Sequence, residues 1–398
     1  MVGQIRQCNP EDNETIWKLV SYAYGAPESV HEKFIERLNL IGKEFFLSEV
    51  DGNAVALARV LDLEQNVRGL LKPMAGIGMV ASAPEFRRLG YTYDLLRGIF
   101  ESIKQNGVAV STLYPFKDTF YEKIGYAKMP PALTLEVNPN SLSGISVAPG
   151  YSAKREEGED MLKTWRALHE AMVTNIHGAV KRSNLRWEEK NRNFALKAVI
   201  ARDPAGKPEG ILLYSIKGYS EGHSWAETGQ INVEEFIWTS LAARDTLLNF
   251  IYKHADQIAK VTMKISPPIH EDYYHWISNV YAPTLKSNIV SMARIVDVER
   301  SLSGFNVENF DTLLLEIRDS QIESNSGVFE FSEKSGKLSV CRASGKAKTA
   351  IGIEGLTSIL YGTLNEAQLR RLGWLEGEQS DSLFEMFPRA VPWLTEDF

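Results

Sequence analysis

Hydrophobic residues follow two alternating periods along the first 138 residues, which predicts a mixed α/β domain. From Arg88 onward, large apolar residues recur with the spacing of one helix face, at Leu89, Tyr93, Leu96, Phe100 and Ile103. Two continuous apolar runs, 76–84 and 108–113, flank this helix and predict buried strands. The same patterns predict helices over 13–24, 29–38 and 118–123, and strands at Ile5, 44–50, 54–63 and 132–137.

The pattern beyond residue 138 predicts two further domains. Residues 138–151 are rich in turn formers and have few large apolar side chains, which indicates a linker. The following elements, beginning with a long helix over 157–176, repeat the order of the first half without a strict sequence repeat. From residue 287 onward, strands followed by paired helices indicate an α+β domain. The predicted domains are therefore 1–138, 151–286 and 287–398.

The last segment, 383–398, is expected to dock against the body of the protein. Its sequence, LFEMFPRAVPWLTEDF, contains too many large apolar side chains to remain in water as a tail. It also carries Glu396 and Asp397 beside the carboxylate of Phe398. Three negative charges in one short tail would attract a polyamine if the tail lined a cleft.

Charge argues against a nucleic acid partner. The 398 residues contain 44 Lys and Arg against 51 Asp and Glu, a formal charge of -7. Proteins that bind phosphate backbones usually carry the opposite balance. A cationic substrate is a better match to this composition.

The sequence predicts neither a membrane span nor a secretory signal. The longest stretch without charged residues, 137–153, is polar and contains Pro139 and Pro149, so it does not resemble a spanning helix. The first residues lack an apolar core, and we therefore expect a cytoplasmic location. Cys8 and Cys341 are too few for a disulfide framework or a four-cysteine zinc site, and we expect both to be free thiols.

Residues 80–92, VASAPEFRRLGYT, carry the densest chemical signal. A buried strand leads through a Pro turn and two arginines into an amphipathic helix. Free backbone N–H groups at such a helix start can bind a pyrophosphate, and Arg87 and Arg88 would add charge-assisted donors. An exposed loop with solvated arginines is the alternative. The usual Gly-rich motifs for ATP and dinucleotides, GxxxxGK[ST] and GxGxxG, are absent.

This strand, turn and helix, followed by TFYEKIGY at 119–126, resembles the GNAT superfamily of acyl-CoA-dependent N-acyltransferases. Thr92 departs from the pattern, because many members carry a second small residue there. With MARIVDVERSL at 292–302 and an aromatic C-terminal residue, the whole chain resembles Eis-type (enhanced intracellular survival) acetyltransferases. The resemblance implies an α/β fold with mixed sheets, in which two tandem GNAT-like domains precede an α+β sterol carrier protein-like domain.

The resemblance also implies a set of site residues. Only the first GNAT domain would bind acetyl-CoA, and 151–286 indeed lacks a second Pro-x-x-Arg-Arg-x-Gly pattern. Val80 and Ser82 would offer backbone groups to the pantetheine arm. The pyrophosphate would be held by Arg87, Arg88, Gly90, Tyr91 and Thr92. Tyr121 falls on the family's catalytic tyrosine, and the Phe398 carboxylate falls on its C-terminal base.

The chemistry of amine acetylation asks for the same kinds of group. The amine must lose a proton, the developing oxyanion needs a donor, and the leaving thiolate needs a proton. A backbone N–H near Val80 would serve the oxyanion. Tyr121 would protonate the sulfur, since a tyrosine with a pKa of about 10 is protonated at neutral pH. The alternative for Tyr121 is a packed aromatic beside Phe116 and Phe120.

Other polar groups favour structural roles. His270 and His275 lie beside acidic residues but lack HExxH spacing and a third ligand, so no metal is expected. His169 and His177 could border a substrate cleft, although a structural role is favoured. Acidic pairs such as Glu188-Glu189 are typical of solvated faces.

Two functions of different classes follow. The preferred one is an acetyl-CoA-dependent N-acetyltransferase acting on primary amines of a polycationic small molecule, aminoglycoside- or polyamine-like, or on lysine side chains. The alternative is a protein that binds an apolar ligand in the third domain and uses the GNAT halves as scaffold. Neither uses a nucleic acid or a membrane, and the resemblance implies a homo-oligomer, a hexamer.

Overall fold

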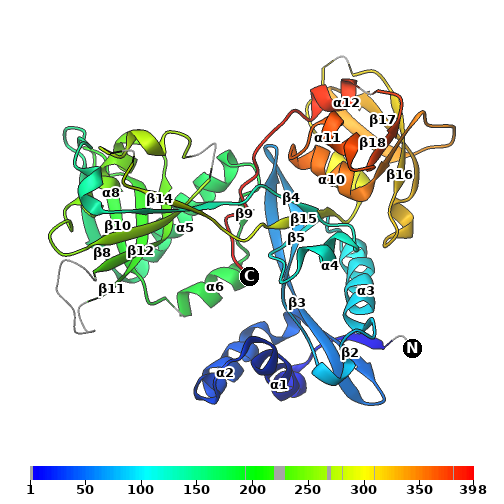
Figure 1. The fold of residues 1–398 in the computed structure, drawn as a ribbon, viewed down its shortest axis with the longest axis horizontal. Helices are drawn as coiled ribbons and strands as arrows, with labels where there is room; N and C mark the ends of the chain where they lie inside the picture. The colour runs from blue at the N-terminus through cyan, green and yellow to red at the C-terminus, as the bar shows by residue number, and fades with distance from the viewer. Residues whose placement is uncertain are drawn as a thin grey trace. The chain divides into compact units, whose positions relative to one another are not determined.

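The computed structural model describes residues 3–192, 194–218, 229–266, 270–279, 281–308, 310–379 and 381–398. The chain divides into two compact units (Figure 1). The first joins Met1–Pro130, Arg182–Glu189 and Val290–Phe398, and the second joins Pro131–Lys181 and Lys190–Ile289. In the part of the chain that the structure describes, no helix combines the length and the apolar character needed to cross a membrane.

The first unit is built on a sheet with the strand order β1-β2-β3-β4-β5-β15-β6. Its strands are β1 (Gln4–Gln7), β2 (Phe45–Val50), β3 (Asn53–Val67), β4 (Leu70–Ser82), β5 (Val110–Leu113), β15 (Met292–Ile295) and β6 (Ala127–Lys128). Along this order β4 and β5 pair in parallel, and the other neighbouring strands pair antiparallel. Strand β15 follows the second unit in sequence but pairs with β5 and β6. The sequence pattern placed β15 in the third domain, but the strand pairs within the first sheet.

Helix α3 covers one face of this sheet and forms its main core. The helices before residue 130 are α1 (Asn13–Tyr24), α2 (His31–Ile41), α3 (Tyr91–Gln105) and α4 (Asp118–Glu122). The apolar side of α3 packs with Ala75 and Ile77 of β4 in one buried cluster. The helix begins at Tyr91 rather than at Arg88, because Arg88 and Gly90 both have left-handed φ angles, 63° and 92°. Leu89, which precedes the helix, is exposed.

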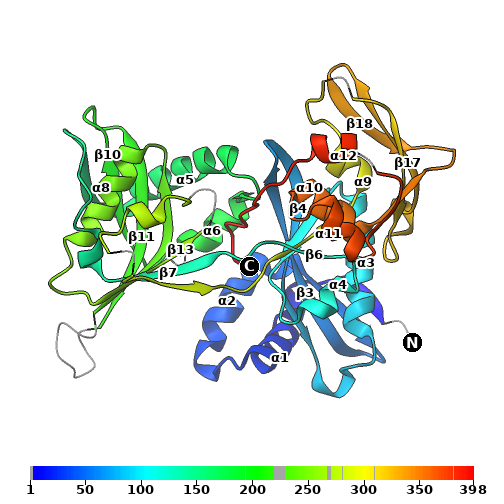
Figure 2. The ribbon, with the colours of Figure 1, turned by 45° about the horizontal axis from the view of Figure 1, so that its top comes forward.

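The C-terminal part of the first unit forms a separate sheet with the order β18-β17-β16-β19-β20. These strands are β16 (Leu313–Arg318), β17 (Gly327–Lys334), β18 (Lys337–Arg342), β19 (Thr349–Gly352) and β20 (Leu375–Gly377). Its helices are α9 (Val298–Leu302), α10 (Ile353–Tyr361), α11 (Glu366–Arg371) and α12 (Asp381–Met386). Figure 2 shows α10, α11 and α12 gathered on one side of β17 and β18. Leu383, Phe387 and Leu394 are buried, which confirms that the final segment docks.

The second unit contains a sheet with the order β14-β7-β13-β12-β11-β10-β8. Its strands are β7 (Leu133–Val137), β8 (Ser152–Glu156), β10 (Lys197–Arg202), β11 (Pro208–Lys217), β12 (Gln230–Trp238), β13 (Lys260–Ile265) and β14 (Thr284–Ser287). The remaining elements of this unit are α5 (Gly158–Asn175), β9 (Val180–Lys181) and α8 (Leu241–Tyr252). Helix α6 (Asn184–Arg192) begins in the first unit, and only its last residues, from Lys190, belong to the second.

Two features of this unit differ from the pattern-based prediction. Strand β7, which the pattern places at the end of the first domain, pairs with β13 and β14. The predicted linker is also partly structured, because Leu142 within it is buried in the core of this sheet. Both differences arise because strand pairing and burial depend on contacts distant in sequence, which local composition does not report.

Candidate active site

Strands β4 and β5 separate in the middle of the first sheet. Their parallel ladder ends at the pair Ile77 and Leu113, whereas β4 continues against β3 as far as Ser82. The register of β4 against β3 shifts between Gly78 and Ala81, and Met79 there has a φ of 45°. This bulge bends β4 at the point where β5 ends. Such a separation leaves backbone groups of β4 available to a ligand.

The chain from β4 into α3 forms a loop suited to an anion. A short 3-10 turn, Pro84–Phe86, precedes Arg87 and Arg88, and Gly90 is the N-cap of α3. Gly90 makes no side-chain cap, and the first N–H groups of any helix lack partners inside the helix. These donors and the helix dipole therefore favour a bound negative charge.

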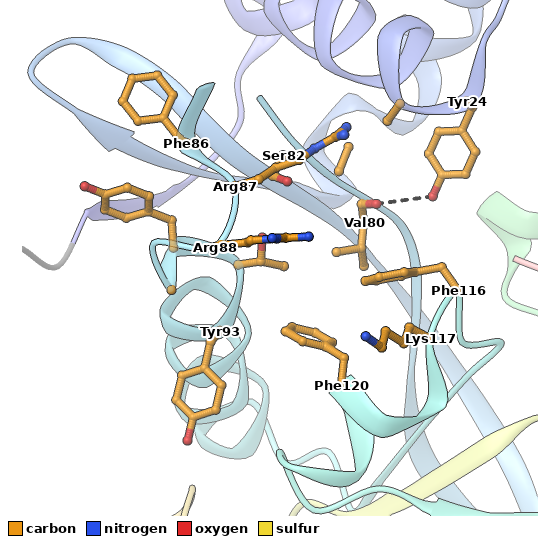
Figure 3. A pocket seen from close by; sticks show the side chains of 15 residues that line it. Tyr24, Val80, Ser82, Phe86, Arg87, Arg88, Tyr93, Phe116, Lys117 and Phe120 are labelled. Carbon is orange, nitrogen blue, oxygen red and sulfur yellow. Dashed lines mark hydrogen bonds between the residues drawn. The ribbon is translucent and has the colours of Figure 1, made fainter. Parts of the chain in front are cut away.

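A cavity of about 690 Å³ lies beside this loop (Figure 3). Seven of its lining residues are the predicted cofactor residues Val80, Ser82, Arg87, Arg88, Gly90, Tyr91 and Thr92. The remaining lining residues are Ala23, Tyr24, Ala81, Phe86, Tyr93, Phe116, Lys117 and Phe120. The structure thus brings all seven residues together at one concave surface.

The cavity wall is cationic and aromatic. Arg87, Arg88 and Lys117 supply positive charge, and no Asp or Glu occurs among the lining residues. Arg87 stacks over the ring of Tyr22 at 5.7 Å, and the Tyr24 hydroxyl donates to the Val80 carbonyl at 3.4 Å. Sequence reasoning missed the aromatic residues of α1 and Lys117. The apolar pattern around them gives no signal that they face a cavity.

Tyr121 on α4 lies behind this wall rather than on it. Only 2% of the residue is exposed, and its ring packs at right angles to Phe120, at 5.1 Å between centroids. It also contacts Phe116 at 5.5 Å, and both phenylalanines line the cavity. Burial raises the pKa of Tyr121, and the nearby hydroxyls of Tyr126 and Tyr24 raise it further. The phenol therefore keeps its proton throughout the neutral range.

Phe398 lies against two glycines of β4. A methyl group on Gly78 would stand 2.8 Å from the carboxyl carbon of Phe398, and one on Gly76 would stand 3.2 Å from its ring. Tyr114 faces the same ring at 6.3 Å between centroids, and its hydroxyl donates to the Leu394 carbonyl at 3.2 Å. The structure thus places the Phe398 carboxylate at the point where β4 leaves β5.

Glu396 and Glu189 are buried and paired with arginines. The sequence instead predicted a substrate-facing charge for Glu396 and a solvated one for Glu189. Glu396 is 1% exposed and accepts hydrogen bonds from Arg182 and Arg186, so its charge is neutralised inside the protein. Glu189 is 3% exposed and is bound by Arg59 and Arg186. These ion pairs could not be predicted from local sequence, because the partners of Glu396 lie more than 200 positions away.

The histidines lie apart from these groups. His169 and His270 are buried, His177 is half-buried, and none of the three lines the cavity. Among the described residues, no group of three or more His, Cys, Asp and Glu side chains is placed to hold a metal ion. Cys8 is buried, and neither cysteine forms a disulfide.

Family models match three consecutive parts of the chain. An acetyltransferase (GNAT) domain matches residues 4–129, a second acetyltransferase (GNAT) domain matches 178–295, and a sterol carrier protein domain matches 298–395. The expected order of two GNAT domains and a sterol carrier-like domain is confirmed.

Relatives in sequence are N-acetyltransferases. An uncharacterized N-acetyltransferase of Streptomyces avermitilis is 23% identical over 348 residues, 83% of each chain. The N-acetyltransferase Eis of Mycobacterium tuberculosis is 25% identical over 172 residues, 42% of this chain and 41% of its own.

Solved structures share the fold over nearly the whole chain. A GCN5-related N-acetyltransferase from Anabaena variabilis has a TM-score of 0.86 at 22% identity, and covers 99% of this chain and 100% of its own. Eis1 from Mycobacterium abscessus has a TM-score of 0.79 at 16% identity, with the same coverage. With its two GNAT domains, its sterol carrier domain and its relatives among N-acetyltransferases, the chain is an Eis-type N-acetyltransferase of the GNAT superfamily.

Proposed function

We propose that the protein transfers the acetyl group of acetyl-CoA to a primary amine. The observation that carries this proposal is the cationic cavity beside the β4 bulge, which is lined by all seven residues expected to hold the cofactor. Only the first GNAT domain would bind acetyl-CoA, because the second lacks the Pro-x-x-Arg-Arg-x-Gly loop.

The residues present fit acetyl-CoA. Arg87, Arg88 and the N–H groups around Gly90, Tyr91 and Thr92 would hold its pyrophosphate through charge-assisted hydrogen bonds. The backbone groups of Val80 and Ser82 would bind the pantetheine arm along β4. Acetyl-CoA supplies an activated acyl group, and the protein supplies its orientation and the proton transfers.

Two residues are proposed to move the protons. The Phe398 carboxylate accepts a proton from the attacking amine, and Tyr121 donates one to the departing sulfur. The raised pKa of Tyr121 supports this role, because a general acid must be protonated before the reaction. A backbone N–H near Val80 stabilises the negative charge that develops on the acyl oxygen.

We propose as acceptor an amine of a polycationic small molecule, aminoglycoside- or polyamine-like, or a lysine side chain. The net charge of -7 and the exposed Asp397 beside the Phe398 carboxylate support a cationic acceptor. Glu396 does not add to this attraction, since Arg182 and Arg186 neutralise it. We also propose that the protein is cytoplasmic and that it forms a homo-oligomer, a hexamer. Light scattering on the purified protein tests the oligomeric state directly.

Calorimetric titration with acetyl-CoA and an acceptor screen test the function. The screen measures release of free CoA with aminoglycosides, diamines and lysine peptides, and each product is identified by mass spectrometry. We expect saturable acetyl-CoA binding and transfer to at least one of these amine classes. Absence of acetyl-CoA binding at millimolar concentration would disprove the proposal.

A further inference from the structure

The last residues of the chain are held by a buried ionic cluster. Glu396 receives Arg182 Nε on one carboxylate oxygen at 2.6 Å and Arg186 Nε on the other at 2.7 Å. Arg186 also donates through Nη2 to the main-chain carbonyl of Asp397 at 2.7 Å. One guanidinium therefore binds both the side chain two residues before Phe398 and the backbone one residue before it.

The cluster continues to the strand beneath Phe398. Arg186 Nη1 donates to Glu189 at 2.6 Å, and the same Glu189 oxygen accepts from Arg59 Nη2 on β3 at 2.8 Å. Arg59 is the register partner of Gly78, the residue against which the Phe398 carboxylate lies. The cluster thus links the final residues to the part of β3 and β4 where their carboxylate lies.

The ionic cluster is buried, so loss of one of its partners is costly. Glu396, Arg182 and Arg59 are at most 4% exposed, and Arg37 and Glu44 join the cluster at Glu189 and Arg59. A buried ion pair adds little net stability over apolar packing, but loss of one partner leaves an uncompensated charge. We therefore interpret the cluster as a structure that fixes the position of the last residues of the chain. Without it, the last residues of a chain are expected to fray.

We propose that Arg186, together with Arg182 and Glu396, is a positioning residue that holds the Phe398 carboxylate over the β4 bulge for proton transfer. This inference rests on the proposed function, in which that carboxylate is the base. Arg182 and Arg186 lie within the region matched by the second GNAT model, which lacks the cofactor loop. The second matched region thereby supplies part of the machinery that orients the base.

Kinetics of three variants test the role. Arg186→Gln removes the charge and the fork of donors, and we expect kcat to fall about 10²-fold, since a small misplacement of a reacting group has an effect of that size. The KM for acetyl-CoA should stay within about twofold, because Arg186 does not line the cavity. Arg186→Lys keeps the charge but not the three donor directions, and should recover part of kcat. Arg389→Gln is the control. Arg389 is an exposed arginine of the same tail, and it binds the Thr363 carbonyl instead.

Release of Phe398 by a carboxypeptidase supplies a readout besides activity. In the unmodified protein the cluster should protect the final residue. Arg186→Gln should release Phe398 about tenfold faster or more, because it removes charge-assisted hydrogen bonds to Glu396 and to the Asp397 carbonyl. Arg389→Gln should release it at the unmodified rate.

The outcomes separate the two proposals. Full kcat in folded Arg186→Gln, or equal release of Phe398 from this variant and the unmodified protein, overturns the positioning role. If Arg186→Gln does not fold, Arg186→Lys and Glu396→Gln decide by the same two measurements. Failure of the proposed function would appear differently, as absence of acetyl-CoA binding and of CoA release in the unmodified protein.

Discussion

Tyr121 is held among aromatic rings that themselves form the cavity wall. Phe116 and Phe120 shield it, and its neighbour Tyr126 is tied by a 2.7 Å hydrogen bond to Ser111. A phenol that is buried and still close to the cavity stays protonated, as an acid for a departing thiolate must. The same surroundings also suit a residue that only packs, so the hydroxyl has to be tested apart from the ring.

Tyr121→Phe makes that separation, because it keeps the ring and removes only the hydroxyl. We expect kcat to fall by about 10²-fold or more, within the usual range for general acid catalysis, with little loss of thermal stability. Tyr361→Phe is the matched control, since Tyr361 is also fully buried and its hydroxyl binds Gln65. The control should lower stability and leave kcat unchanged. Normal turnover in Tyr121→Phe would leave Tyr121 as a packed aromatic.

Arg87 and Arg88 are the exposed cations of the loop that is proposed to bind the cofactor. The double variant Arg87→Ala, Arg88→Ala should raise the KM for acetyl-CoA about tenfold or more, because each charge-assisted phosphate contact contributes roughly 1.5–3 kcal/mol. Steady-state kinetics at saturating amine measures this change, and the KM for the amine serves as the internal control. An unchanged cofactor KM would mean that the two arginines are merely solvated.

His270 makes the second unit sensitive to acid. Its ring is buried against Trp238, at 5.1 Å between centroids, and burial lowers its pKa from 6.5 to about 4. Between these two pH values the unfolded chain binds a proton that the folded protein does not. Stability therefore falls as the pH drops from 6.5 to about 4. The full loss is roughly 3 kcal/mol for this shift.

Thermal unfolding across that pH range measures the effect. His270→Asn cannot titrate and keeps an acceptor for the Ser266 N–H, which donates to Nδ1 at 3.0 Å. This variant should be less stable at pH 7 but should lose less stability between pH 6.5 and 4 than the unmodified protein. His275→Asn, at an exposed position of the same segment, is the control and should behave like the unmodified protein. Parallel pH profiles for all three would contradict the assignment.

At the scale of elements, β4 unites the two halves of the proposed chemistry. Its edge beyond Ile77 is free of β5 and leads into the loop that is proposed to bind the cofactor. Gly76 and Gly78 lie two residues apart on the strand, so they share a face and leave room for the ring and carboxylate of Phe398. Neither glycine has a left-handed φ, so close approach is the reason that a side chain is excluded.

Gly78→Ala tests that close approach. Its methyl group would stand 2.8 Å from the carboxyl carbon of Phe398, too close for van der Waals contact, so the tail must move. We expect kcat to fall by about tenfold or more, as for other small displacements of a reacting group, with the KM for acetyl-CoA unchanged. Gly144→Ala is the control, because nothing lies within 4 Å of its Cβ position. Equal kcat values in the two variants would exclude a role for Phe398 in the reaction.

Local patterns predicted those elements whose apolar faces are regular. The helix over 13–24 was predicted at the bounds that α1 has. Helix α3 was predicted to start too early, because Leu89 fits the helical spacing although the glycine and arginine around it adopt left-handed φ angles. The loop over 84–90 could be proposed as a cofactor site from its motif, since its residues are adjacent in sequence, and this role stays a prediction.

The pairing of distant segments could not be predicted in this way. Glu189 belongs to an acidic pair that looks solvated, and Glu396 to a tail that looks anionic, yet arginines neutralise both. The burial of such charges depends on partners from other parts of the chain, which hydrophobic periodicity does not encode. Strand β15 between β5 and β6 is a second example.

At the scale of the whole molecule, the first unit gathers segments from three separate parts of the sequence. Lys72 on β4 donates to the carbonyls of Arg300 and Ser303, at 2.8 and 2.6 Å, and Arg68 binds the carbonyls at the end of α10. These contacts attach the sterol carrier-like region to the first sheet within this unit. They fix the place from which the final segment runs back to β4 (Figure 1).

The proposed base is the main-chain carboxylate of Phe398, so the covalent state of the chain end should matter more than the side chain there. Deleting residues tests this poorly, because loss of buried Leu394 or of the Phe398 ring would harm the protein under either interpretation. Appending a few Gly and Ser residues after Phe398 keeps every side chain and converts the carboxylate into an amide.

We expect this extended protein to remain folded and to bind acetyl-CoA with unchanged affinity, because no residue of the cavity wall is altered. Acetyl transfer should fall by about 10²-fold or more, the usual contribution of a general base. Calorimetry and CoA release measure the two properties, and the same Gly and Ser residues added before residue 1 provide the control. A small displacement of the tail would also slow transfer, and proteolytic removal of the extension back to Phe398 separates this effect from loss of the base. Recovery of kcat after trimming supports the carboxylate, whereas full kcat before trimming excludes it and leaves a water molecule or Asp397 to accept the proton.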